Sequence, residues 1–335
     1  MHKIILIGTS AGGLHALAKI TSVLPANLAA TVLIVMHIGA HASVLPKILQ
    51  KQCSLPVAHA QDGEPLLLGR ILIAPPDLHL TVEKYQGQPI ARLWHGPKEN
   101  HTRPAIDPLF RSAAAAFDGH VIATILTGYL DDGTAGLHAV KTCGGHAVVQ
   151  DPSDAQVPDM PASAIAHVMV DQVLPLHEIG PALVAWVDCA ELSAGETGSA
   201  RLQPMVPEWL LVENSYVKGE AGLRDLQKIG SPSGYTCPEC NGSLWKITDA
   251  VPARYRCHTG HSFSARVLSK LQDEAVEMAL WSSLRALQEK LRMEEEFVQS
   301  SSAQVDLEAQ QSHRQRAAKL HADINTLHAL LAKSD

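Results

Sequence analysis

The 335-residue chain has no long apolar run, no signal-peptide pattern and no cluster of basic residues. Its apolar runs are as short as strands, far below the roughly 18 residues of a membrane-spanning helix, so we expect no membrane insertion. The first apolar run lacks a small-residue cleavage site, which predicts a cytoplasmic protein. Because the formal net charge is -7 and lysines and arginines are not clustered, we expect no binding to nucleic acid.

Apolar residues are plentiful, at 46%, whereas charged residues make up 18%. This balance supplies a globular core and excludes disorder of the whole chain, which requires low hydrophobicity and high charge. At about 100–200 residues per domain, the length allows two or three domains. The six cysteines of a cytoplasmic protein are not expected to form structural disulfides.

Residues 1–189 alternate between short apolar segments and helix-like segments. Such alternation is typical of a parallel sheet covered on both faces. We therefore predict an α/β domain with a doubly wound, mainly parallel sheet in three layers (α/β/α), and an inserted hairpin at 78–93. The predicted strands are 4–7, 32–36, 70–74, 121–126 and 147–149, and the predicted helices are 12–23, 43–52, 107–117, 132–143 and 175–187.

Three further segments follow this domain. Residues 190–232 have the mixed composition of a linker, and residues 233–263 form a compact, zinc-ribbon-like unit that contains Cys and His. Residues 264–335 have no Gly or Pro and carry apolar residues at helical spacing on both sides of a serine triplet. This pattern predicts two amphipathic helices in a hairpin or coiled coil, or one long surface helix packed on the main domain.

A glycine-rich loop, GTSAGG at residues 8–13, follows the first predicted strand and opens a helix. A dinucleotide-binding loop requires glycine where Ser10 stands, and a Walker A loop requires Gly-Lys-Ser/Thr, so neither pattern fits. The loop instead places a hydroxyl at a strand-to-helix turn, beside the free N–H groups of a helix N-terminus. Ser10 is therefore either a nucleophile or a simple N-cap.

Two other predicted strands end in groups that a nucleophilic serine needs. His37 ends the second strand, and Asp131 and Asp132 follow the strand at 121–126. Because the carboxyl ends of parallel strands meet at one edge of a sheet, we expect these side chains to lie near Ser10. A histidine can serve as the base of a catalytic triad, and an aspartate can serve as its orienting acid. The chain order Ser, His, Asp differs from that of α/β-hydrolases and disfavours an ordinary lipase or esterase.

Six separated motifs resemble, in order and spacing, those of the CheB-type catalytic domain of bacterial protein-glutamate methylesterases. The motifs are GTSAGG, VMHIG, ILIAPPDLHL, RPAIDPLF, ILTGYLDDGTAGL and QDPSDAQVPDMPASAI. The resemblance implies hydrolysis of glutamate γ-methyl esters on methylated chemoreceptors, with deamidation of glutamine as a further reaction, and no cofactor for catalysis. Motif by motif, Ser10 resembles the nucleophile, His37 the base and Asp132 the orienting acid. The backbone N–H groups of Ala11 and Tyr129 are the expected donors to the oxyanion.

The chain departs from the family pattern at several places. Tyr129-Leu130 replaces the usual Met-Gly, and Asp159 stands where glycine is common. The bulk of Tyr129 is expected to change substrate access. The chain begins at the catalytic domain, so we expect no regulation by a phosphorylated receiver domain of the same chain. The C-terminal helices are instead candidates for contact with a regulatory partner or for a homodimer.

Cysteine and histidine recur in a second pattern within residues 233–263. A CPEC knuckle is followed by CHTGH, and three thiolates with one imidazole suit a closed, tetrahedral, structural zinc site. The predicted ligands are Cys237, Cys240, Cys257 and His261. His258 is the alternative fourth ligand, but the glycine before His261 gives the chain room to turn. A redox CxxC motif is disfavoured because its usual βαβ context is missing.

Two hypotheses from different classes follow. The first is a CheB-like carboxyl-ester hydrolase that acts on a methylated receptor or a related protein. The second is a catalytically quiet scaffold that keeps the fold and binds partners through its zinc unit and helical tail. The complete set of Ser10, His37 and Asp132 favours the enzyme.

Overall fold

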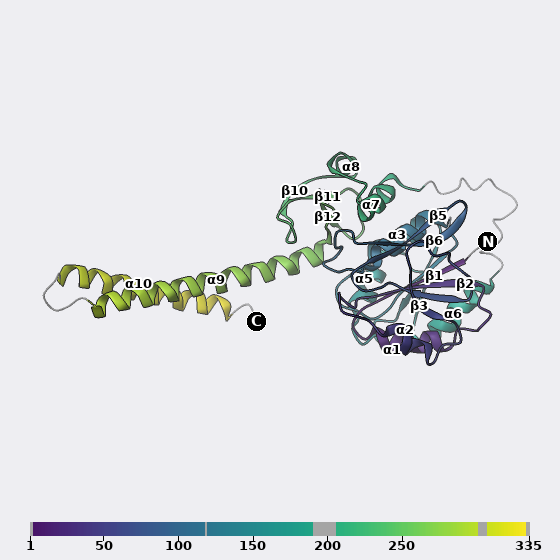
Figure 1. Ribbon diagram of the computed structural model, residues 1–335, viewed down its shortest axis with the longest axis horizontal. Coiled ribbons are helices and arrows are strands. Elements are labelled where there is room, and N and C mark those ends of the chain that lie inside the picture. Colours follow the sequence, from purple (N-terminus) through teal and green to yellow (C-terminus); the bar gives the residue numbers. More distant parts are fainter. Residues whose placement is uncertain (1–2, 118, 190–205, 301–306, 333–335) are drawn as a thin grey trace. The chain divides into compact units, whose positions relative to one another are not determined.

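The structure, a computed structural model, describes residues 3–117, 119–189, 206–300 and 307–332 (Figure 1). The chain divides into two compact units, Met1–Leu268 and Ser269–Asp335. Within the described ranges, no helix is both long and apolar enough to cross a membrane.

A seven-stranded parallel sheet forms the centre of the first unit. Its strands, in spatial order, are β3 (Val57–His59), β4 (Arg70–Ile73), β2 (Ala30–Met36), β1 (Lys3–Thr9), β7 (Val121–Ile125), β8 (His146–Gln150) and β9 (Gln172–Leu174). The chain winds outward from β1 in both directions, and all neighbouring strands are parallel. The predicted doubly wound sheet is confirmed, and its switch point lies at the carboxyl end of β1, where such folds bind ligands.

Helices cover both faces of this sheet (Figure 1). One face carries α1 (Gly13–Ser22), α2 (Leu45–Gln50) and α6 (Leu176–Asp188), and the other carries α3 (Ile106–Ala116), α4 (Thr134–Thr142) and α5 (Asp159–His167). The hairpin of β5 (His79–Tyr85) and β6 (Gln88–Trp94) packs against α3. Side chains of β1 alternate between the faces, so Leu6 joins one core cluster and Ile7 the other. Burial on both sides explains the continuous apolar run at residues 4–7 of this strand.

Two helices occupy much of the segment that we predicted as a linker over 190–232. Residues 190–205 lie outside the described residues, but α7 (Glu208–Lys218) and α8 (Leu223–Ile229) follow. Leu210 on α7 is fully buried in the core cluster that includes α3. The apolar patch around residues 209–212 is therefore the buried face of a helix, and α7 and α8 are part of the fold.

A four-stranded antiparallel sheet, here called the ribbon, covers residues 230–264. Its strands are β10 (Gly230–Thr236), β11 (Ser243–Ile247), β12 (Arg254–Cys257) and β13 (Ser262–Ser264), paired in chain order. The ribbon belongs to the same compact unit as the parallel sheet. It corresponds to the Cys/His-containing segment predicted at 233–263.

Charged side chains are buried where the ribbon meets the α/β part. Arg111 on α3 donates to both carboxylate oxygens of Glu99, at 2.7 and 2.8 Å. Arg256 on β12 reaches the same carboxylate at 3.0 Å, and Arg254 pairs with Glu213 on α7 at 2.6 Å. All five side chains are at most 3% exposed. Removing one partner would leave an unpaired buried charge, so these pairs join the ribbon to the parallel-sheet domain.

Two long helices form a hairpin in the C-terminal part of the chain. α9 (Ala265–Ser300) begins in the first unit and continues through the second, where α10 (Leu307–Leu331) runs back along it (Figure 1). Their shared core contains Leu284, Leu291, Leu320, Ile324 and Leu331. The described residues therefore form the hairpin that the helical spacing predicts, not one continuous helix.

Candidate active site and metal centre

The carboxyl ends of β1, β2 and β7 bring three reactive side chains together. Oγ of Ser10 lies 3.1 Å from Nδ1 of His37, and Nε2 of His37 lies 2.8 Å from Oδ2 of Asp132. Ser10 directly follows β1, His37 directly follows β2, and Asp132 lies in the turn between β7 and α4. The three residues selected from the sequence thus form one continuous chain of hydrogen bonds.

The contacts of His37 define its tautomer. Nε2 faces a carboxylate, which only accepts hydrogen bonds, so this nitrogen carries the proton. Nδ1 of the neutral ring is then an acceptor, and it faces the hydroxyl of Ser10. The serine proton therefore points at a basic nitrogen, as a general base requires.

The carboxylate of Asp132 is buried and firmly held. Oδ2 also accepts the N–H of Ile106 at 2.6 Å, and Oδ1 accepts Nδ2 of Asn100 at 2.9 Å. Burial acts to raise the pKa of this carboxyl, but the hydrogen bonds from His37, Ile106 and Asn100 outweigh it and lower the pKa below its usual value. Asp132 is therefore charged at neutral pH and can stabilise a protonated His37.

Asp107, the neighbouring buried acid, behaves in the opposite way. Burial, and secondly the charge of Asp132, raise its pKa to about 8. Its Oδ1 accepts the N–H of Gly136 at 2.6 Å, and its Oδ2 accepts Nδ2 of Asn100 at 3.1 Å. The pKa of Asp107 is thus raised while that of Asp132 is lowered, so the negative charge of the pair is favoured on the member that faces His37.

The backbone N–H groups of Ala11 and Tyr129 lie at this edge of the sheet. Across the described ranges, the N–H groups of Ala11 and Tyr129 make no hydrogen bond, whereas that of Ser10 donates to the carbonyl of Thr127. The loops that carry Ser10 and Gly128 approach so closely that a Cβ on Gly128 would lie 2.8 Å from Cβ of Ser10. Free donors that follow the serine and the glycine are suited to bind a developing oxyanion.

The two departures from the family pattern contact each other. Leu130 has a left-handed backbone conformation, with φ 66°, which costs a non-glycine residue about 1–2 kcal/mol. Oδ2 of Asp159 accepts the N–H of Leu130 at 3.2 Å. Arg266, in the first turn of α9, in turn donates to Asp159 at 2.9 Å. Asp159 and Arg266 therefore help to hold the turn whose glycine is missing.

An open cavity of about 450 Å³ lies beside Ser10. Its walls include Leu14 and His15 of α1, Met36 at the end of β2, and Gln156. Mostly apolar walls, with the amide of Gln156 at one side, suit an uncharged, extended side chain of a substrate. Through the cavity such a side chain can reach the hydroxyl of Ser10.

His79, the first residue of β5, is fully buried and holds the start of α3. Nδ1 accepts the N–H of Ala105 at 3.2 Å, and Nε2 donates to the carbonyl of Pro97 at 3.0 Å. One ring nitrogen accepts and the other donates, so only the neutral imidazole fits. Burial is the main cause that lowers the pKa of His79 from 6.5 to about 4.

This lowered pKa predicts acid sensitivity. Below pH 6.5 the unfolded chain binds a proton at His79 that the folded chain still rejects, so stability falls as the pH falls towards the folded-state pKa. We expect a loss of about 2 kcal/mol in the free energy of unfolding between about pH 7.5 and pH 5 from this group alone. Urea titrations of the wild type and a His79→Gln variant at both pH values measure it. An equal pH dependence in the two proteins would assign the sensitivity to other groups.

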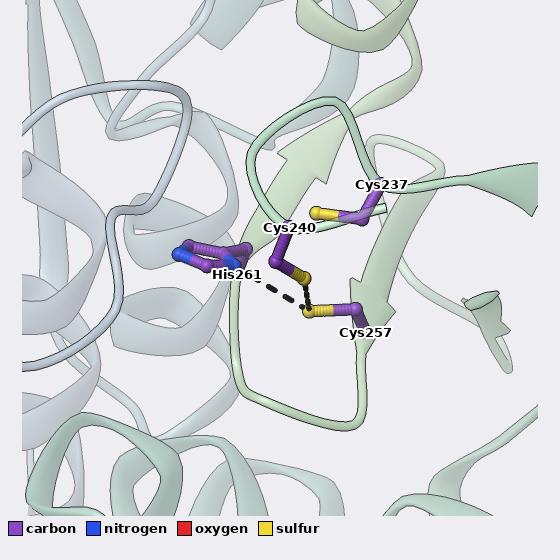
Figure 2. Close-up of side chains that lie close together, drawn as sticks. All are labelled: Cys237, Cys240, Cys257 and His261. Carbon is purple, nitrogen blue, oxygen red and sulfur yellow. Dashed lines mark hydrogen bonds between the residues drawn. The ribbon is translucent and has the colours of Figure 1, made fainter. Parts of the chain in front are cut away.

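The four predicted metal ligands meet in the ribbon (Figure 2). The candidate ligand atoms of Cys237, Cys240, Cys257 and His261 all lie within 4.8 Å of one another. Sγ of Cys257 lies 3.7 Å from Sγ of Cys240 and 3.6 Å from Nδ1 of His261. A tetrahedral zinc ion with ordinary bond lengths would separate two sulfurs by roughly 3.8 Å, and a sulfur and a nitrogen by roughly 3.6 Å. The donor set and its spacing therefore fit zinc, with His261 in the group and the alternative His258 outside it.

The sequence did not indicate the residues that hold the triad acid and its neighbour in place. Asn100 contacts Asp132, and Oγ of Ser264 donates to Oδ1 of Asp131 at 2.7 Å. These pairs join positions that are far apart in the chain and have no characteristic spacing. Only the folded structure brings them together.

Comparison with known proteins gives consistent matches over the first half of the chain. The model of the CheB methylesterase family matches residues 5–183. A solved structure, the Thermotoga maritima CheB methylesterase catalytic domain, matches with a TM-score of 0.54 and 35% identity, and covers 55% of this chain and 98% of that one.

Three curated relatives match the same region. Azospirillum brasilense and Ralstonia nicotianae each have a protein named protein-glutamate methylesterase/protein-glutamine glutaminase, 38% and 37% identical over 180 and 184 residues. The matches cover 53% and 55% of this chain, and 46% and 48% of those proteins, so the matched region spans about half the length of these two relatives. A Leptospira interrogans protein, whose name pairs the same two activities, is 39% identical over 179 residues, 53% of this chain and 91% of its own length.

Proposed function

Since the chain belongs to the CheB methylesterase family, we propose that it is a carboxylic ester hydrolase that cleaves glutamate γ-methyl esters on a chemoreceptor-type protein. Deamidation of glutamine on the same protein is the second reaction, in line with the paired names of its relatives. The chain of hydrogen bonds from Ser10 through His37 to Asp132 carries the proposal, because it is the arrangement by which a serine, a histidine base and an orienting acid perform acyl transfer.

Acylation begins when His37 accepts the hydroxyl proton of Ser10 at Nδ1 and Oγ attacks the ester carbonyl. Asp132 holds the ring through Nε2–H and stabilises the imidazolium that forms. The N–H groups of Ala11 and Tyr129 bind the negative oxygen, and one such donor is worth about 3–4 kcal/mol. His37 then gives its proton to the leaving oxygen, and methanol departs from the acyl-enzyme.

Deacylation repeats these steps with water as the nucleophile. His37 removes a proton from water as the oxygen attacks the acyl carbon, and the proton then returns to Oγ of Ser10. Free glutamate side chain and free enzyme result. With a glutamine substrate the same residues act, and ammonia leaves in place of methanol.

The metal centre of the ribbon has a structural role in this proposal. Cys237, Cys240, Cys257 and His261 would supply all four ligands of a zinc ion, so no position stays open for substrate or water. The ion, when bound, holds the ribbon strands together. The ion would take no direct part in the bond-breaking steps, which belong to the triad residues.

Methanol release tests the proposed activity directly. The full-length chain is incubated with a chemoreceptor fragment whose glutamates carry isotopically labelled methyl esters, and volatile label is counted. We expect release that increases with enzyme concentration, and no release from an unmethylated fragment. A protein that binds the fragment but releases no methanol would instead be the catalytically quiet scaffold.

A further inference from the structure

We propose that strand β13 of the ribbon positions the acid of the catalytic triad, with Asn100 as the link, so that the folded, metal-loaded ribbon sets the rate of hydrolysis. The inference rests on the proposed function and deepens it, since it gives the ribbon a role in regulating the same site. Asn100 and Ser264 act through Asp132 and Asp131 and are positioning residues.

Asn100 is buried between the ribbon and the triad. Its Nδ2 donates to Oδ1 of Asp132 at 2.9 Å and to Oδ2 of Asp107 at 3.1 Å. The other oxygen of Asp132 faces His37, so the contact with Asn100 helps the N–H groups of Ile106 and Asp107 to fix the rotation of this carboxylate. A carboxylate that can rotate would no longer hold the imidazole in one orientation, which is the task of a triad acid.

The ribbon determines which way the amide of Asn100 faces. The N–H of Ser264 donates to Oδ1 of Asn100 at 2.9 Å, and the N–H of Asn100 donates to the carbonyl of Ser262 at 2.7 Å. An amide side chain has one accepting and one donating end. The N–H of Ser264 keeps the accepting end towards β13 and therefore the donating end towards the carboxylates. A flipped amide would place its oxygen against Asp132.

The ribbon side also holds the residues next to the acid. Oγ of Ser264 donates to Oδ1 of Asp131 at 2.7 Å. Arg266 donates to Asp159 at 2.9 Å, and Asp159 accepts the N–H of Leu130 at 3.2 Å. The turn that carries the triad acid and one expected oxyanion donor is therefore held at two adjacent residues, Leu130 and Asp131.

The metal ligands fix the end of the β12–β13 hairpin. Cys257 is the last residue of β12, and His261 directly precedes β13. The N–H of Cys257 donates to the carbonyl of His261 at 3.0 Å, and Arg256 pairs in register with Ser262. Loss of a ligand would loosen this hairpin and, with it, the two serines that hold Asn100.

The full-length chain with an Asn100→Ala substitution tests the link. We expect kcat for methyl-ester hydrolysis to fall about tenfold to a hundredfold, the value of one hydrogen bond to a charged group. KM should change less than about twofold, because the acid acts on the transition state. The low-field NMR proton on Nε2 of His37 should weaken, which a merely structural contact would not cause. An unchanged kcat and an unchanged proton signal would overturn the proposal.

A matched pair of serine variants separates positioning from general stability. Ser264→Ala removes the hydroxyl that contacts Asp131 and should lower kcat, although less than Asn100→Ala does. Ser243→Ala removes an equally small hydroxyl from strand β11 of the same ribbon, where the side chain is exposed, so its kcat should match the wild type. Equal losses of kcat in both variants would contradict a specific role of Ser264.

Metal removal provides the decisive cross-check. Chelation should lower wild-type kcat about tenfold or more and weaken the Nε2 proton signal of His37, and added zinc should restore both. In Asn100→Ala, chelation should lower kcat less than about twofold further, because the link is already cut. The same loss in both proteins would show that the metal acts only through overall stability, which overturns the proposal.

The NMR signal also separates this proposal from the proposed function. A wild-type protein that releases no methanol, but whose His37 proton responds to Asn100→Ala and to chelation, would refute the esterase and leave the positioning intact. A protein that releases methanol, but whose His37 proton signal and kcat stay the same after Asn100→Ala and after chelation, would refute only the proposed role of the ribbon in positioning Asp132.

Discussion

A Ser10→Ala variant is expected to lose methyl-ester hydrolysis by about 10⁴-fold or more. Without Oγ no acyl-enzyme can form, and His37 has no hydroxyl to deprotonate. The remaining rate would come only from binding and from the oxyanion donors. Because the substitution removes one small side chain and its hydrogen bond to His37, the free energy of unfolding should change by about 1 kcal/mol or less.

Methanol release and thermal unfolding, measured on the same preparations, check this expectation. Ser22→Ala is the matched control, since Ser22 lies at the last residue of α1, the helix that follows Ser10, and its exposed hydroxyl donates to the carbonyl of Lys19. That variant should keep full activity. Covalent labelling by an organophosphonate should modify the wild type and the control but not Ser10→Ala. Normal hydrolysis by Ser10→Ala would require another nucleophile.

A Cys257→Ser variant is expected to lose the bound zinc and the folded ribbon. Sγ of Cys257 lies within 3.7 Å of both Cys240 and His261, so its loss removes the ligand between two others. Structural zinc contributes about 10–16 kcal/mol of binding free energy in isolated finger peptides. Even a fraction of this exceeds the effect of most point substitutions, typically about 0.5–3 kcal/mol.

Metal content and hydrogen exchange measure the two parts of this prediction. The wild type should contain about one zinc per chain, and Cys257→Ser should contain almost none, with faster amide exchange in β11 and β12. His258→Ala is the control, because this neighbouring histidine lies outside the ligand group, and it should keep its zinc. Zinc retained in both Cys257→Ser and His261→Ala would contradict the assignment of these residues as zinc ligands.

The long strands were predictable because both faces of the sheet are buried, which gives β1 and β2 the continuous apolar runs 4–7 and 32–36. The edge strands β3 and β9 were not, since each has only three residues and none of them is fully buried. Helix α5 was missed because prolines stand at its start and inside its first turn, where they suggest a loop.

The reactive groups were predictable from the sequence, whereas the residues that hold them in place were not. Ser10, His37 and Asp132 follow strands of one parallel sheet, so the topology places them at one edge before any distance is known. The metal ligands stand in two local clusters with a recognised spacing. Asn100, by contrast, pairs with Ser264, 164 residues away, and nothing in either local sequence indicates the other. Long-range polar pairs of this kind depend on packing that a sequence pattern does not encode.

The buried pairs between Arg111, Glu99 and the ribbon have a consequence for how this chain unfolds. The region shared with the family ends at residue 183, but the compact unit continues to Leu268. The surface of the α/β part that meets α7 and the ribbon is a buried interior, closed by Leu210 and by charges that are paired across it. A substitution that removes one partner of these pairs would leave a buried charge unpaired, so we expect the α/β part and the ribbon to unfold together.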